Sequence, residues 1–446
     1  MSDADTIVAI ATAPGRGGVG VVRVSGPAVP VMAGILTGKQ LPPRQATLAT
    51  FFDEHGGPLD QGIALRFSAP ASFTGQDVLE LHGHGGHAVL GLLVKRCLML
   101  GARLAEPGEF TRRAFLNEKL DLAQAESVAD LIEAASEEGA RSAARSLVGE
   151  FSSRVETLVQ ELIGLRTHVE ACVDFPEEEI DTAELAAIKN KGESLSAALA
   201  ALQQAASQGA VLREGLTVVL IGRPNVGKSS LLNRLAGEDL AIVTPIPGTT
   251  RDQVRATIHL NGVPIHLIDT AGLRETEDEV ERLGIERTWQ AVSKAGAALL
   301  LAEAGESLAL PEAALLNRLP PSLPLAWVHN KIDLHGWQAG ERQQDGQASF
   351  RISALTGEGL EPLRDWLLQT AGWKPQGESV FMARARHLAA LEEAARHLTA
   401  AGSEISQFEL MAEELRLAQR ALGRITGEFG ADDLLGEIFS RFCIGK

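Results

Sequence analysis

The sequence predicts a multidomain protein in which an α/β domain is combined with an all-α domain. Between about residues 215 and 370, apolar β-branched runs alternate with helical patterns, which is typical of a parallel sheet. Helical periodicity occurs on both sides of this region, so the simplest topology inserts the α/β domain into a discontinuous helical domain, 119–214 with 371–446. Strand and turn patterns dominate residues 1–118 and predict a separate α+β N-terminal domain.

The N-terminal region begins with two predicted strands around a glycine-rich turn. Residues 6–12 form a β-type run, 14–20 read Pro-Gly-Arg-Gly-Gly-Val-Gly, and a second strand follows at 21–24. A dinucleotide-binding fingerprint requires a helix at that place, so we reject this interpretation. Arg23 lies between two valines and is expected on the face opposite the apolar one, where an ordinary solvated residue is an equally good interpretation.

A turn rich in glycine and histidine ends a further predicted strand. Glu80 lies between two leucines in that strand, and His82, His84 and His87 precede a helix expected from Ala88. Three histidines at this spacing could bind a metal ion. We favour polar turn residues near a helix N-terminus, because no cysteine or carboxylate sits close in the glycine turn.

Long amphipathic helices are expected in the middle and at the end of the chain. Apolar residues recur at three- and four-residue steps over 115–132, and helix continues over 155–172 and to about Gln208. An acidic segment at 174–181 interrupts them at a proline and is more typical of a solvated helix start than of a metal site. Apolar positions from 382 to 398 again share one helix face.

The negative net charge of the chain limits how it can bind a nucleic acid. The 446 residues carry a formal net charge of −17, which opposes non-specific binding to nucleic acids. An RNA partner would therefore need a local basic face. The candidate patches are Arg112–Arg113, Arg384–His387 and Arg416–Arg424, although ordinary solvated helix faces explain them as well.

Cysteine usage and hydropathy indicate the compartment. Cys97, Cys172 and Cys443 are widely spaced and form no C-x-x-C, which fits a reducing cytosol without a disulfide framework or a zinc site. The acidic N-terminus has no basic region of a secretory signal, and no run of eighteen uncharged apolar residues occurs. We therefore expect a cytoplasmic protein without membrane insertion.

The α/β domain carries the pattern G-x-x-x-x-G-K-S at Gly222–Ser229. A predicted strand leads in and a helical pattern from Ser230 leads out, which is the context that a phosphate-binding loop needs. Backbone N–H groups would surround phosphate oxygens, Lys228 would reach the β- and γ-phosphates, and the Ser229 hydroxyl would bind Mg²⁺. An ordinary glycine-rich turn is the poorer interpretation, because the flanking elements are also present.

Three further motifs follow at predicted strand ends. Asp269 is placed to hold the Mg²⁺ shell through water, and Gly272 to meet a γ-phosphate. Asp333 of N-K-x-D can accept from the two donors of a guanine edge that adenine lacks, while Asn330 can bond the purine N7 edge. The Ser-Ala-Leu stretch at 353–355 would close the pocket over the guanine O6. Together the four motifs resemble those of the TRAFAC-class GTPases and predict a GTP site in a P-loop GTPase domain.

A set of motifs is spread over nearly the whole chain: PGRGGVGVVRVSG, FTGQDVLELHGHGG, FLNEKLDLAQAE, DFPEEEID, GRPNVGKSS, PGTTRD, DTAGLRETEDEVE, NKID and a terminal CIGK. Together these motifs resemble those of the MnmE (TrmE) family of tRNA-modification GTPases. The resemblance implies a homodimer that works with the flavin-containing partner MnmG (GidA), in a heterotetramer or larger complex. Together they would add an aminomethyl or carboxymethylaminomethyl group to C5 of the wobble uridine of certain tRNAs.

The same resemblance implies that a tetrahydrofolate derivative supplies the one-carbon unit and is bound by the N-terminal domain. Cations suit the carboxylates of a folate tail, and a carboxylate suits the N–H pair of a pterin. Cys443 lies in the C-terminal CIGK stretch, and we favour an inert apolar role for it over a reactive one. By motif match, the folate contacts fall on Arg23, Glu80, Lys119 and Lys446.

Many GTPases have a glutamine directly after D-T-A-G that orients the attacking water. Here that position is Leu273, which cannot hydrogen-bond water, so hydrolysis needs another group for this role. The resemblance implies K⁺ as a stabiliser of developing charge, completed when two G domains meet, and Glu281 as the residue that orients water. For Glu281, membership of a solvated acidic run is the alternative. Thr250 would bind Mg²⁺ when the γ-phosphate is present. The expected K⁺ ligands are Asn225, Thr244, Ile246 and Thr249.

The expected GTP contacts come from five stretches, and Glu281, Lys228 and Asn225 are the expected catalytic residues. The contacts are Asn225, Val226, Gly227, Lys228, Ser229, Ser230, Thr244, Pro245, Ile246, Pro247, Gly248, Thr249, Thr250, Asp269, Thr270, Ala271, Gly272, Asn330, Lys331, Asp333, Ser353, Ala354 and Leu355.

Two other functions share the G domain. A K⁺-dependent GTPase switch could act as a ribosome-assembly factor, but the N-terminal block and the terminal Cys-Ile-Gly-Lys argue against it. A membrane ion-transport GTPase would need spanning segments, which the sequence lacks.

Overall fold

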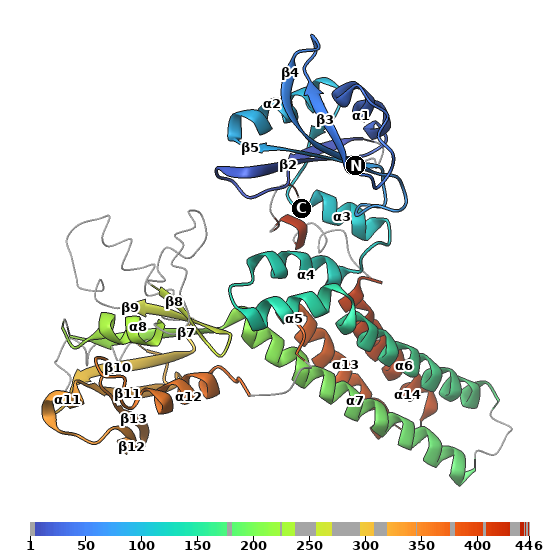
Figure 1. Ribbon diagram of the computed structural model, residues 1–446. Helices are drawn as coiled ribbons and strands as arrows, with labels where there is room; N and C mark the ends of the chain where they lie inside the picture. The colour runs from blue at the N-terminus through green and yellow to red at the C-terminus, as the bar shows by residue number, and fades with distance from the viewer. Residues whose placement is uncertain are drawn as a thin grey trace, which may run out of the picture. The chain divides into compact units, whose positions relative to one another are not determined.

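The computed structural model in Figure 1 divides into two compact units, each described here by itself. The first contains residues 1–132, 146–198 and 390–446, and the second contains 133–145 and 199–389. The division falls within helices α7 (Thr182–Glu214) and α13 (Ala385–Ser403). The structure describes residues 5–175, 181–223, 225–236, 256–269, 295–306, 319–344, 346–374, 380–404, 407–428, 438–440, 442 and 445.

A six-stranded sheet forms the N-terminal part of the first unit. Its strand order is β3-β4-β5-β2-β1-β6, with β1 parallel to β6 and the other neighbours antiparallel. The strands are β1 (Ile7–Ile10), β2 (Gly17–Ser25), β3 (Thr47–Phe52), β4 (Pro58–Phe67), β5 (Val78–Gly85) and β6 (Arg103–Leu104).

Helices α1 (Val29–Thr37) and α2 (His87–Met99) pack on one face of this sheet. The apolar positions of β2 and β5 point toward them and form a buried core. Because side chains alternate along a strand, Arg23 and Glu80 lie on the opposite face. Phe110 of α3 (Glu109–Leu116) packs on that second face with residues of β1.

Helices form the rest of the first unit: α4 (Leu122–Glu133), α6 (Glu150–Asp174), α14 (Phe408–Thr426), and parts of α7 and α13. α6 packs along α14, and each buries one apolar stripe. Residues at three- and four-residue spacing on one face explain this pairing, as the periodicity predicted.

The helical stretch expected over 115–132 is interrupted, which corrects the sequence prediction. α3 ends at Leu116 and α4 begins at Leu122. Glu118 lies between them at φ 56°, a left-handed conformation that cannot continue a right-handed helix. Side-chain periodicity does not reveal this turn, because the apolar positions keep helical spacing across it.

The second unit contains a seven-stranded sheet in the order β12-β13-β11-β10-β7-β9-β8. β7, β9, β10, β11 and β13 run parallel, while the edge strands β8 and β12 run antiparallel to their neighbours. The strands are β7 (Leu216–Gly222), β8 (Ala256–Leu260), β9 (Val263–Asp269), β10 (Ala297–Glu303), β11 (Leu325–Asn330), β12 (Gly340–Gln344) and β13 (Gln347–Arg351).

Both faces of this sheet are apolar, as expected for parallel strands covered on two sides. Val218 and Leu220 of β7 share a core with α8 (Lys228–Ala236) and α12 (Leu360–Thr370), whereas Val219 and Ile221 contribute to a core on the other face. Helices α5 (Glu137–Leu147) and α11 (Ile332–His335) complete the described elements. The predicted α/β domain inside a helical domain is thus confirmed.

Among the described residues, no helix combines the length and the apolar content that crossing a membrane requires.

Candidate guanine-nucleotide site

The motifs of the second unit lie at the carboxyl ends of its parallel strands. The phosphate loop follows β7, N-K-x-D follows β11, and Ser353–Leu355 follow β13. Parallel strands bring these ends to one edge of the sheet, which is where open α/β sheets bind ligands.

The phosphate loop is shaped by close packing and left-handed backbone. A Cβ atom at Gly222 would lie 2.5 Å from the Leu301 carbonyl oxygen, so only glycine allows this approach to β10. Asn225 and Gly227 have φ angles of 67° and 95°. The buried Lys228 donates from Nζ to the Gly222 carbonyl, which holds its ammonium inside the loop. Ser229 and Ser230 are exposed at the start of α8.

Asn330 ties the phosphate loop to the Ser-Ala-Leu loop. Its Nδ2 donates to the Val226 carbonyl at 2.9 Å, and its Oδ1 accepts from the Ala354 N–H at 2.9 Å. The side chain is buried, and a Cβ atom at Gly227 would lie 2.2 Å from its Nδ2. Asn330 therefore holds two motifs together, and its bond to the purine N7 edge stays a prediction.

The base side of the site presents the exposed carboxylate of Asp333. Asp333 lies in the first turn of α11, and the preceding Lys331 donates to Glu303 Oε2 at 2.6 Å. Hydrogen bonds from Lys331 and then from His335 lower the pKa of Glu303. Glu303 thus contacts a residue at each end of α11, and the role of Asp333 in binding guanine stays a prediction.

Arg234 and Glu303 support this site and were missed by the sequence reasoning. Arg234 donates to the carbonyls of Ala354 and Leu355, which fixes the Ser-Ala-Leu loop against α8. The only sequence signal for Glu303 is an acid that ends an apolar strand, and Arg234 carries none beyond its place in α8.

The N–H groups that should close over the guanine are already partly engaged. Ser353 N–H donates to the Glu358 carbonyl and Ala354 N–H to Asn330. The O6 contact therefore stays a prediction for Leu355 or for a rearranged Ala354.

Several predicted site residues lie outside the described residues, and Asp269 is described for its backbone alone. The others are Thr244, Pro245, Ile246, Pro247, Gly248, Thr249, Thr250, Thr270, Ala271, Gly272, Leu273, Glu281, Cys443 and Lys446.

In the first unit, the structure brings Arg23 and Glu80 together. They are direct cross-strand partners, with Arg23 Nε 2.9 Å from Glu80 Oε1. The rings of Phe73 and Phe110 lie 5.8 and 5.9 Å from the guanidinium, so the interpretation of Arg23 as a solvated residue is wrong. Lys119 is exposed just after α3.

Two of the three histidines, His82 and His84, lie within strand β5 and contact separate carboxylates, one on the same strand and one on β4. His82 Nε2 lies 3.2 Å from Glu80 Oε2, and His84 Nδ1 lies 2.7 Å from Asp60 Oδ1. The separate partners argue against a metal site shared by His82 and His84. The predicted turn is wrong for these two residues, because β5 continues through both of them to Gly85.

Two predicted nucleic-acid patches contain buried residues, which corrects the sequence interpretation. Arg113 is 3% exposed and binds Asp5 and Glu109, and His387 is 2% exposed. Neither side chain faces solvent, because each is packed inside its own unit. The half-buried Arg112 and the exposed Arg416 remain candidates.

Comparisons with known proteins identify the family of this chain. Residues 6–119 match the family model of the GTP-binding protein TrmE N-terminus, and residues 122–443 match that of the MnmE helical domain. The chain is 61% identical to the tRNA modification GTPase MnmE of Thiobacillus denitrificans, over 99% of this chain and 98% of that protein. It is 59% identical to the MnmE of Chromobacterium violaceum, with the same coverage. Among solved structures, the G domain of the T. maritima FeoB iron transporter is 26% identical with a TM-score of 0.27, covering 35% of this chain and 98% of that chain. The chain therefore belongs to the MnmE family of tRNA modification GTPases.

Proposed function

We propose that this chain couples GTP hydrolysis to the addition of an aminomethyl or carboxymethylaminomethyl group at C5 of the wobble uridine of certain tRNAs. The function named for its relatives, tRNA modification GTPase, supports this proposal. The observation that supports GTP binding is the pair of hydrogen bonds that Asn330 forms, one to the phosphate loop and one to the Ser-Ala-Leu loop. Asn330 thereby joins the phosphate end and the base end of one site.

In this proposal, Lys228 exchanges its bond to the Gly222 carbonyl for oxygens of the β- and γ-phosphates. The exposed Ser229 hydroxyl fits a Mg²⁺ ligand at a helix N-terminus, with Thr250 as a second ligand and Asp269 acting through water. The exposed carboxamide of Asn225, held by a left-handed backbone, fits a K⁺ ligand, with Thr244, Ile246 and Thr249 supplying further oxygens. Bound Mg²⁺ and K⁺ would neutralise developing negative charge, and Glu281 would orient the attacking water.

The second face of the N-terminal sheet fits a folate. Arg23 is a cation for a folate carboxylate, Glu80 an acceptor for the pterin N–H pair, and the half-exposed Phe73 offers an aromatic face beside them. Lys119 and Lys446 would complete the site. Bound tetrahydrofolate would supply the one-carbon unit, while these side chains orient it.

Calorimetry with 5-formyl-tetrahydrofolate tests this site on the full-length chain. Arg23→Ala should abolish the binding heat. Arg44→Ala is the matched control, because Arg44 also lies over a phenylalanine ring of this sheet, Phe67 at 5.7 Å. Wild-type protein that gives no binding heat would remove the folate from the proposal.

As a homodimer in the cytoplasm, the chain would act with the flavin-containing partner MnmG in a heterotetramer or larger complex on tRNA. The test combines the purified chain, this partner, unmodified tRNA, a reduced folate, the amine donor and GTP, and then measures wobble nucleosides by mass spectrometry. Wild-type protein should yield the modified uridine and Lys228→Ala should not. An unmodified uridine in the complete wild-type mixture would favour the ribosome-assembly alternative.

A further inference from the structure

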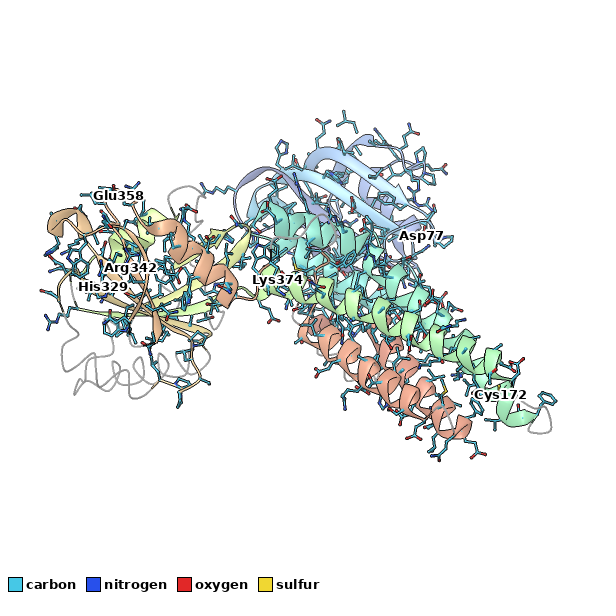
Figure 2. All side chains as sticks on the ribbon, turned by 90° about the horizontal axis from the view of Figure 1, so that it is seen from below. Asp77, Cys172, His329, Arg342, Glu358 and Lys374 are labelled. Atoms are coloured by element: carbon cyan, nitrogen blue, oxygen red, sulfur yellow. The ribbon has the colours of Figure 1, made fainter. Side chains whose placement is uncertain are left out.

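Three metal-ligating side chains meet where α6 ends and α7 begins. Figure 2 shows Cys172 at the end of its helix. His168 Nε2 lies 2.8 Å from Glu184 Oε1, and the ligand atoms of His168, Cys172 and Glu184 all lie within 4.8 Å of one another. Within the described ranges, this is the one such group of three His, Cys, Asp or Glu residues.

Two helices hold this arrangement. His168 and Cys172 are four residues apart on α6, so they lie one above the other on the same face. Glu184 comes from the first turn of α7. All three side chains are neither fully buried nor fully exposed, so a cation could reach them from solvent. The group is formed by tertiary packing, which explains why cysteine spacing in the sequence did not indicate it.

The donor set selects the class of cation. Imidazole nitrogen, thiolate sulfur and carboxylate oxygen together suit Zn²⁺, whereas Mg²⁺ and Ca²⁺ prefer oxygen alone. Bond lengths of about 2.0–2.3 Å around a tetrahedral ion place ligand atoms roughly 3.3–3.8 Å apart. The ligand atoms of the three side chains lie within 4.8 Å of one another, which is close to this range.

We propose that His168, Cys172 and Glu184 bind Zn²⁺ or a similar thiophilic divalent cation, with a water molecule in the fourth position. Binding forms a bond from the cation to Sγ of Cys172, breaks the S–H bond and releases its proton to solvent. Partial burial, and then the negative charge of Glu184, raise the pKa of Cys172, so the thiol carries that proton when no cation is bound. The bound ion would link α6 to α7 next to the segment that joins them.

The test titrates the full-length chain with Zn²⁺ against a competing chelator and repeats the titration with Co²⁺. Wild-type protein should bind one equivalent, and the Co²⁺ form should show a sulfur-to-cobalt charge-transfer band and the visible bands of a tetrahedral ion. Loss of an outer partner of a metal ligand costs about 10- to 100-fold in affinity. Loss of a direct ligand in Cys172→Ser or His168→Ala should therefore weaken binding by at least about 100-fold.

His397→Ala is the matched control. His397 forms the same kind of interhelical pair, with Nδ1 2.6 Å from Glu414 Oε2, in the same unit. No cysteine belongs to that pair, and the His397→Ala variant should bind Zn²⁺ as the wild type does. Wild-type affinity in Cys172→Ser, or equal losses in all three variants, would overturn the proposal.

A second measurement needs no variant and therefore does not depend on their folding. Zn²⁺ should protect Cys172 of the wild-type chain from iodoacetamide at alkaline pH, as read by mass spectrometry of its peptide. Addition of a chelator should restore the reaction. Equal rates of alkylation at Cys172 with and without Zn²⁺ would overturn the proposal.

Discussion

The side-chain carboxamide of Asn330 holds two loops of the nucleotide site together. It joins them because one carboxamide bonds to both Val226 and Ala354. Gly227 makes this possible in two ways, through its left-handed backbone and through the absence of a Cβ atom beside Asn330 Nδ2. The site's geometry therefore depends on two residues that lie about a hundred positions apart.

Gly227→Ala should abolish nucleotide binding and lower stability. Its Cβ atom would lie 2.2 Å from Asn330 Nδ2, and a left-handed alanine costs about 1–2 kcal/mol by itself. Gly346→Ala separates these effects, because Gly346 also has a positive φ of 77° but no atom within 4 Å of its Cβ position. The Gly346→Ala variant should lose only the stability that corresponds to the strained backbone, and it should bind GDP as the wild type does. Equal GDP affinity in both variants, measured by calorimetry, would show that the Asn330 contact is unimportant.

Asp333→Asn should change the base that the site accepts. An amide cannot accept both guanine donors, so GTP affinity should fall by roughly 100-fold, while affinity for xanthosine triphosphate should rise. Asp365→Asn is the control, since Asp365 is an exposed aspartate of the same unit. Fluorescent-nucleotide competition measures both variants. An unchanged preference for GTP over the xanthine nucleotide would place the guanine elsewhere.

At the scale of an element, α3 is held by a buried ionic network rather than by its apolar residues alone. Glu109 accepts hydrogen bonds from Arg103 and Arg113, and both arginines also bind Asp5. Burial would raise the pKa of Glu109, but the hydrogen bonds from Arg103 and Arg113 outweigh it and lower that pKa below its ordinary value of 4.5. The network ties α3 to β6 and to the start of the chain.

Glu109→Ala should reduce the free energy of unfolding by about 3–5 kcal/mol, because it removes the buried carboxylate of this network and leaves Asp5 as the acidic partner of both arginines. Since the folded-state pKa is depressed, the stabilisation from Glu109 is complete above about pH 5 and is lost as the pH falls through the folded-state pKa. Urea unfolding from pH 7 down to pH 3 should show the difference between wild type and variant shrinking with acid. Glu413→Ala, which removes an exposed pair with Arg416, should have no measurable effect. A difference for Glu109→Ala that persists unchanged at pH 3 would contradict this role of its charge.

The elements that could be predicted from sequence are those whose signal is local. The strand, glycine loop and helix of the phosphate site are contiguous, so their pattern was sufficient. The contact of Arg23 with Glu80 depends on the register between β2 and β5, which no local pattern specifies. Arg113 binds Asp5, which is 108 residues away in the sequence, and no local pattern reveals this contact, so the sequence indicated a surface patch.

At the scale of the whole molecule, the described contacts link the nucleotide domain to a helix outside its sheet. The turn between β8 and β9 packs against the start of α5, where Ser136 Oγ donates to the Gly262 carbonyl at 2.9 Å. Asn261 and Gly262 form this two-residue turn with φ angles of 47° and 81°, as a tight hairpin requires. Any movement of this sheet edge during hydrolysis would therefore reach α5 directly.

Hydrolysis should be at least about tenfold faster in KCl than in NaCl of equal concentration, because the K⁺ ion proposed at Asn225 would stabilise developing charge. Turnover per chain should also rise with protein concentration, since the proposed K⁺ site is complete only when two G domains meet. Asn225→Ala should remove the difference between the salts, while Asn233→Ala, an exposed amide on α8, should retain it. Equal rates of phosphate release in the two salts would remove K⁺ from the mechanism.

The most direct test of the central claim measures the dissociation constants of the full-length chain for GDP, GTP, ADP and ATP in one buffer with Mg²⁺. A site that hydrogen-bonds a base discriminates strongly against one lacking those groups, so guanine nucleotides should bind at least about 100-fold more tightly. Equal affinity for guanine and adenine nucleotides would contradict the account.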